Sequence, residues 1–114
     1  MTYMPLDNDQ HVIPAMRLKA TGGAHAITAT TTSARNVTGF NANTRVVSVY
    51  ATGNVYLRFG GATVTAANTD HYFPTGVYYD FAICGGAGKV GQFTHLAVLA
   101  ADGTDCSVYI SEKE

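Results

Sequence analysis

Charged residues are scarce in this sequence. Asp, Glu, Lys and Arg make up 13% of its 114 residues and leave a formal net charge of −1. An average soluble domain has about 25% charged residues, so we expect a largely neutral, polar surface. The basic residues form no cluster along the chain, and such a cluster is the usual footprint of nucleic-acid binding. The composition therefore argues against a nucleic-acid partner and favours a surface that is covered in an assembly.

Long apolar runs are also missing. No stretch approaches the roughly 18 apolar residues that a membrane span needs, so no membrane partner is expected. The start, MTYMPLDNDQHVIP, has no basic segment followed by an apolar run, which predicts synthesis and use without Sec export. Cys84 and Cys106 lack the spacing of a metal or redox site. We expect both to be reduced and half-buried. A disulfide would require their Cα atoms to lie within about 7 Å of each other.

No catalytic motif in the sequence lies in the structural context that its chemistry requires. Residues 86–91 match GxGxxG after an expected strand, but strand-like sequence follows where a dinucleotide site requires a helix. We interpret this segment as a surface loop. No serine lies in a nucleophile elbow. The histidines show no ligand spacing; they are His11, His25, His71 and His95. The sequence therefore predicts a protein without enzymatic activity, cofactor or metal.

The clearest pattern lies in residues 45–61, RVVSVYATGNVYLRFGG, where side chains alternate with period two on both sides of a turn. We predict a β-hairpin whose three-residue loop is TGN. The predicted register sets Val49 opposite Leu57 on an apolar face and Ser48 opposite Arg58 on an amphipathic face. This hairpin supplies the pattern by which the later segments are interpreted.

Further strands are predicted on both sides of this hairpin. Residues 25–31 are rich in Thr and Ala and continue in an extended form to Val37, which we expect to anchor the segment together with Ile27. Phe40 is expected to close one end of the core. In residues 77–84 alternate side chains again line two faces.

The C-terminal segment predicts a second hairpin. A three-residue loop at 102–104 sets Val98 opposite Val108 and repeats the arrangement of the first hairpin. No segment combines a 3.6-residue period with helix caps. Seven or eight short strands with regular turn signals predict an all-β protein, a single-domain antiparallel β-sandwich that is jelly-roll-like.

Residues 1–23 differ from the remainder of the chain. They are polar and irregular, and Pro5 and Pro14 interrupt any long element. We interpret them as an extended N-terminal arm that precedes a β-sandwich domain at 24–114. Such an arm can pack on its own domain or reach a neighbouring subunit.

Tyrosines mark the outer faces of the predicted strands. Tyr50, Tyr56, Tyr78 and Tyr109 all fall on the non-core parity, and with Arg58 they form our candidate interface. Three explanations stay open: cross-strand pairs with wet hydroxyl groups, a subunit or capsid interface, in which tyrosine is enriched, and a platform on which a sugar stacks. In the third case the Tyr50 and Tyr56 pair would hold the sugar.

From residue 27 onward the order of elements resembles small β-sandwich proteins encoded among the structural genes of tailed bacteriophages. The resemblance is carried by TATTTSARNV at 28–37, by RVVSVYATGNVYLRFGGATVTA at 45–66 and by HLAVLAADGTDCSVYIS at 95–111. It covers about four-fifths of the chain and implies a virion component, a capsid decoration protein or a tail or fibre accessory subunit, usually symmetric and frequently trimeric.

Together the residues and the resemblance predict a non-enzymatic phage virion structural protein. We expect a capsid decoration or cementing protein that binds the major capsid protein or another virion protein, forms a homo-oligomer such as a trimer, and is assembled into virions in the host cytoplasm. The alternatives are a tail or fibre accessory subunit and a carbohydrate-binding module.

Overall fold

The computed structural model describes residues 6–12, 15–84 and 91–113. Within these ranges it contains β-strands and no helix, which confirms the prediction of an all-β chain. None of the described residues belongs to a helix long and apolar enough to cross a membrane. The strands are β1 (Ala24–Ala29), β2 (Ala34–Arg35), β3 (Val46–Ala51), β4 (Val55–Gly60), β5 (His71–Phe73), β6 (Tyr78–Ala82), β7 (His95–Ala100) and β8 (Cys106–Lys113).

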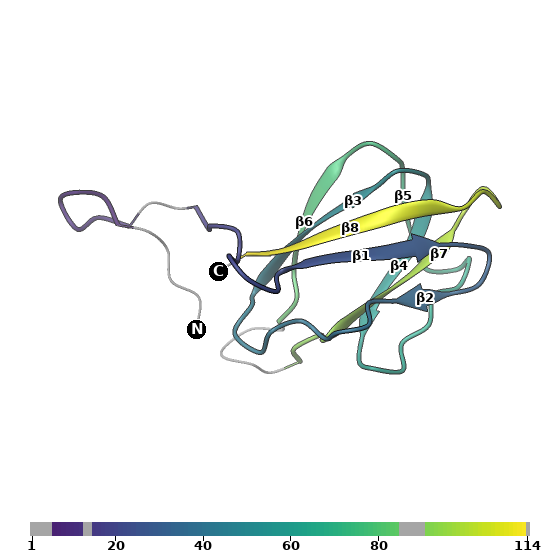
Figure 1. Cartoon of the computed structure of the whole chain (residues 1–114), viewed down its shortest axis with the longest axis horizontal. Helices are drawn as coiled ribbons and strands as arrows, with labels where there is room; N and C mark the ends of the chain where they lie inside the picture. Colours follow the sequence, from purple (N-terminus) through teal and green to yellow (C-terminus); the bar gives the residue numbers. More distant parts are fainter. Residues whose placement is uncertain (1–5, 13–14, 85–90, 114) are drawn as a thin grey trace.

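The strands form two four-stranded antiparallel sheets that pack face to face (Figure 1). The β3 sheet has the order β1-β8-β3-β6, and the β4 sheet has the order β2-β7-β4-β5. The pairs β4–β5, β3–β6, β2–β7 and β1–β8 are nested one outside the other along the chain. The predicted antiparallel β-sandwich is confirmed. Its jelly-roll character stays a prediction, which this nesting of two four-stranded sheets supports.

The core lies between the two sheets and is built from alternate residues of the central strands. Burying one such aliphatic side chain stabilises the fold by about 1.5–3 kcal/mol. Phe40 is buried in this core, as predicted, and so is Ile27, whereas Val37 is 99% exposed and the prediction that it anchors the segment is wrong. The core residues of β3, β4, β7 and β8 are Val47, Val49, Ala51, Val55, Leu57, Leu96, Val98, Ala100, Val108 and Ile110.

Both predicted hairpins are wrong. β3 and β4 lie in different sheets, and so do β7 and β8, so the loops at 52–54 and 101–105 each carry the chain across the sandwich. Ser48 lies opposite Ser111 and not Arg58, and Val98 lies opposite Leu57 and not Val108. Alternation decides which side chains face the core, and that assignment is the same whether two strands pair within one sheet or face each other across the core.

The first crossing loop hydrogen-bonds to the start of β8 and to the second crossing loop rather than closing a hairpin. The backbone N–H of Thr52 donates to the carbonyl of Ser107 at 2.9 Å, and the Ser107 N–H donates back to the Thr52 hydroxyl, also at 2.9 Å. The amide of Asn54 donates to the carboxylate of Asp102 at 2.7 Å. Thr52 therefore binds β8, and Asn54 binds the second crossing loop.

Part of the predicted arm lies against the sandwich. Leu18 forms an isolated bridge with Lys113, and the backbone N–H of Lys19 donates to the carbonyl of Glu112 at 2.9 Å. Residues 6–12 instead form a separate turn at the far end of the long axis, away from both sheets (Figure 1). The arm and its boundary at residue 23 stay predictions.

Two double-cysteine variants distinguish the observed register from a hairpin. In a Cys84→Ser, Cys106→Ser background, we expect Ser48→Cys with Ser111→Cys to form a disulfide on oxidation, because directly opposed residues have Cβ atoms about 4.5–5.5 Å apart. Ser48→Cys with Arg58→Cys should keep both thiols, because these side chains lie on opposite faces of the sandwich. Thiol titration and intact mass give the answer. A disulfide in the Ser48→Cys, Arg58→Cys variant alone would contradict the observed register and support the predicted hairpin.

Candidate interaction surface

Three of the predicted interface tyrosines lie side by side on the outer face of the β3 sheet. Tyr50 is directly opposite Tyr109 of β8 on one side and Tyr78 of β6 on the other. The rings of Tyr50 and Tyr78 have centroids 4.6 Å apart. Tyr78 is 75% exposed and Tyr109 is 50% exposed. We call Tyr109, Tyr50 and Tyr78 the tyrosine row; it presents amphipathic rings of low conformational entropy to solvent.

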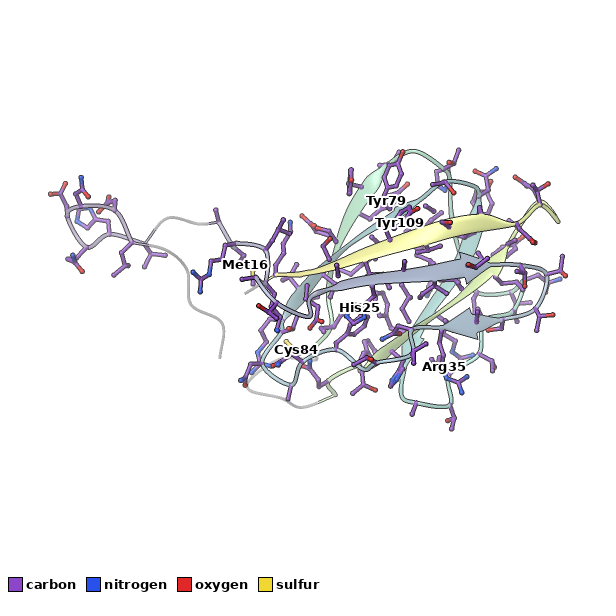
Figure 2. The ribbon with its side chains drawn as sticks, in the orientation of Figure 1. Met16, His25, Arg35, Tyr79, Cys84 and Tyr109 are labelled. Carbon is purple, nitrogen blue, oxygen red and sulfur yellow. The ribbon has the colours of Figure 1, made fainter. Side chains whose placement is uncertain are left out.

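Small side chains border the tyrosine row. Ala26 of β1 continues it beyond Tyr109, and the adjacent row contains Ala24, Ser111 and Ser48. With so few protruding groups beside the tyrosines, another protein surface can approach this sheet closely. Tyr109, labelled in Figure 2, belongs to this sheet, whereas Arg35 comes from the opposite one.

Two opposite charges on this face neutralise each other. Lys113 Nζ lies 3.0 Å from Asp80 Oδ1, and the Ser48 hydroxyl donates to the same oxygen. The hydrogen bond from Ser48, followed by that from Lys113, lowers the pKa of the Asp80 carboxyl below its ordinary value. Asp80 therefore stays ionised at neutral pH and is matched by the lysine. The exposed face around the tyrosine row combines aromatic, small and charge-balanced groups.

Tyr56 and Arg58 do not join this surface. Both lie in β4, on the outer face of the other sheet, so the predicted five-residue interface is divided between opposite sides of the sandwich. Tyr56 packs edge-on against Tyr72 with ring centroids 5.7 Å apart, and Arg58 Nη1 lies 3.9 Å from Asp70 Oδ1. A sugar stacked between Tyr50 and Tyr56 is excluded by this arrangement.

The cysteines match the prediction made for them. Cys84 and Cys106 are both free and half-buried. Burial raises the pKa of the Cys106 thiol above its ordinary value, so at neutral pH it is a protonated packing group and not a nucleophile. It packs against the first crossing loop, where a Cβ on Gly53 would lie 2.8 Å from the Cys106 Cβ.

A buried polar cluster at one end of the sandwich was missed from the sequence. Glu112 is 1% exposed; its Oε2 lies 2.7 Å from His25 Nε2, and its Oε1 accepts bonds from the Thr44 hydroxyl at 2.7 Å and the Asn41 N–H at 2.8 Å. The sequence does contain a signal of its burial, because Glu112 follows Val108 and Ile110 at every second position of β8 and so lies on the core side of that strand. This cluster joins β1, β8 and the loop before β3.

The described residues do not gather into a metal or cofactor centre. Within 6–12, 15–84 and 91–113, no three His, Cys, Asp or Glu side chains come together in a way that could hold a metal ion. The glycine motif at 86–91 lies outside the described residues except for Gly91, which has a φ of +69°. The interpretation of that motif as a surface loop stays a prediction.

Comparisons of this chain with protein-family models, with curated proteins and with solved structures found no match. The candidate function therefore depends on the geometry of the surfaces described above.

Truncation of Glu112 tests the buried cluster. We expect Glu112→Ala to lower the free energy of unfolding by about 3–5 kcal/mol, because it leaves the buried groups of His25, Thr44 and Asn41 without their partner. Urea denaturation measures the loss. The exposed Asp105 provides the control, since Asp105→Ala should stay within about 0.5 kcal/mol of the parent chain. Equal stability of the two variants would contradict a structural role for the cluster.

Proposed function

We propose that this chain is a non-enzymatic structural protein that binds a protein partner through the tyrosine row. The single observation that carries the proposal is the alignment of Tyr109, Tyr50 and Tyr78 across three adjacent strands. Stable protein interfaces are enriched in tyrosine and depleted of unpaired charge at their centres. The outer face of the β3 sheet has both properties, because Asp80 is matched by Lys113.

The outer face of the β4 sheet is a poorer candidate. Arg35 and Arg58 flank Ala97 on that face, and Arg58 has only a long contact with Asp70 at 3.9 Å. Desolvating such charges would oppose association unless a partner matched them. The asymmetry between the two faces favours the tyrosine row as the primary contact.

The partner that we propose is a virion protein. The resemblance of the chain to β-sandwich proteins of tailed bacteriophages, its low charge and its tyrosine row together favour a capsid decoration or cementing role on the major capsid protein. The chain would then act in the virion as a homo-oligomer, with no cofactor. A tail or fibre accessory subunit would use the same face and differ in copy number.

Alanine variants separate the two faces. Tyr78→Ala and Tyr109→Ala should each weaken binding to purified particles by about tenfold or more, because each removes an exposed aromatic ring from the proposed contact. Tyr72→Ala is the matched control, because Tyr72 is 51% exposed, as Tyr109 is 50% exposed, but belongs to the β4 sheet. Co-sedimentation with particles measures binding, and thermal melting verifies that each variant is folded. Equal loss in all three variants would remove the tyrosine row from the proposal.

The copy number in density-banded particles tests the virion assignment. Quantitative mass spectrometry should give a simple ratio of this chain to the major capsid protein for a decoration protein, and only a few copies for a tail or fibre subunit. Absence of the chain from the particles would overturn the virion proposal.

A carbohydrate-binding module is the second candidate, and one observation favours it. The half-buried ring of Tyr50 and the exposed ring of Tyr78, 4.6 Å apart, offer an aromatic platform of the kind on which a pyranose ring stacks. In that case Tyr78→Ala would abolish glycan binding on an array, and Tyr72→Ala would leave it intact. An array without signal for the parent chain would count against this candidate.

A further inference from the structure

An apolar pocket opens at the edge of the sandwich where β5 and β6 end the two sheets. The cavity has a volume of about 250 Å³ and is lined by Leu57, Phe59, His71, Phe73 and Phe81. We call this the edge pocket. Its rings pack edge-on against each other, with Phe73 and Phe81 centroids 5.2 Å apart and Phe59 and Phe81 centroids 5.4 Å apart. This packing holds the walls of the edge pocket in place.

The size of the edge pocket suits a pair of aliphatic side chains. An apolar cavity of about 150 Å³ accommodates a benzene molecule, so about 250 Å³ has room for a larger apolar group. A second cavity of about 430 Å³, lined by Arg58, Phe59, Asp70, His71 and Phe93, shares Phe59 and His71 with the first. An apolar group in the edge pocket would thus have a charged neighbour at its mouth.

Residues 6–12 carry an aliphatic pair that the sandwich does not cover. Leu6 and Val12 form an antiparallel bridge, which places their side chains on one face as neighbours. Leu6 is 51% exposed and Val12 is 60% exposed. The turn between them is held by the Asp7 carboxylate, which accepts bonds from the backbone N–H groups of Asp9 and His11, both at 2.9 Å. The segment is therefore a small, shaped unit with an uncovered apolar face.

The charges of the two features are complementary. Residues 6–12 contain Asp7 and Asp9 and no lysine or arginine, and His11 Nδ1 lies 3.7 Å from Asp7 Oδ2. The mouth of the edge pocket contains Arg58, which is loosely matched by Asp70 at 3.9 Å. An acidic segment approaching from solvent would meet the Arg58 guanidinium, whose side chain is 60% exposed.

We propose that residues 6–12 of one copy dock into the edge pocket of a second copy. Leu6 and Val12 would enter the pocket together, and Asp9 would approach Arg58 at its mouth. The donor is a second copy because residues 6–12 lie away from their own sheets (Figure 1). A segment of one copy then meets a pocket of another, so the contact is heterologous. It closes as an exchanged dimer or a ring where the rotation between copies allows, and otherwise it propagates as an open filament. It does not depend on the tyrosine row, which lies on the outer face of the β3 sheet.

Self-association of the full chain, measured by sedimentation, tests this contact. Leu6→Asp should weaken association by about tenfold or more, because it places a charge in an apolar pocket. Val37→Asp is the control, since Val37 is 99% exposed and lies outside the contact.

A charge swap tests the polar part of the same contact. Asp9→Arg and Arg58→Glu should each weaken association, and the double charge swap should restore much of it. Tyr78→Ala should leave association unchanged, which separates this proposal from the proposed function.

Cross-linking identifies the donor. With Cys84 and Cys106 changed to Ser, a Leu6→Cys chain mixed with a His71→Cys chain should give a disulfide-linked species that contains one of each, as intact mass will show. A chain that stays monomeric at its highest attainable concentration and gives no mixed disulfide would overturn the proposal. A Leu6→Cys, His71→Cys double variant that cross-links only within one chain would also overturn it, because the pocket would then hold its own segment.

Discussion

The sandwich depends on the central pairing of β3 with β8 and of β4 with β7. Each of these pairs joins one strand of the β3–β4 unit to one strand of the β7–β8 unit. Neither unit can therefore bury its apolar side chains without the other. The loops at the crossing end reinforce this dependence, because Thr52 bonds to Ser107 and Asn54 bonds to Asp102. The remaining strands, β1, β2, β5 and β6, are added at the edges of this four-stranded centre. The tyrosine row and the edge pocket both depend on its geometry.

The sequence predicts the faces of the strands better than their partners. Val49 and Leu57 were predicted to lie on the apolar face and are buried in the core, because period-two alternation follows directly from strand geometry. Partner choice depends on contacts distant in the sequence, and nothing local in TGN separates a hairpin turn from a crossing between sheets. The three residues of β5 were too few to show an alternating pattern.

The same reasoning explains the outcome for the candidate interface. Parity placed the four strand tyrosines on outer faces, but it could not assign them to one sheet or the other. Tyr50, Tyr78 and Tyr109 come together because β6 and β8 flank β3, whereas Tyr56 belongs to the opposite sheet. Glu112 shows the converse limit. Parity places Glu112 on the core side of β8, but the partners that balance its carboxylate, His25 and the loop before β3, are distant in the sequence.

The nested order of the strands has a consequence for folding kinetics. β4 and β5 are joined by the shortest nested connection, and each further pair encloses a longer stretch of chain, up to the pairing of Ala24 with Ser111. Loop-closure entropy rises with the length enclosed, so pairing from the β4–β5 connection outward is entropically favoured over direct closure of β1 on β8. Such long-range contacts make a β-sandwich slow to fold, on the scale of milliseconds to seconds. Because β8 lies between β1 and β3, strand exchange at β1 alone would leave the central pairs of this sandwich intact.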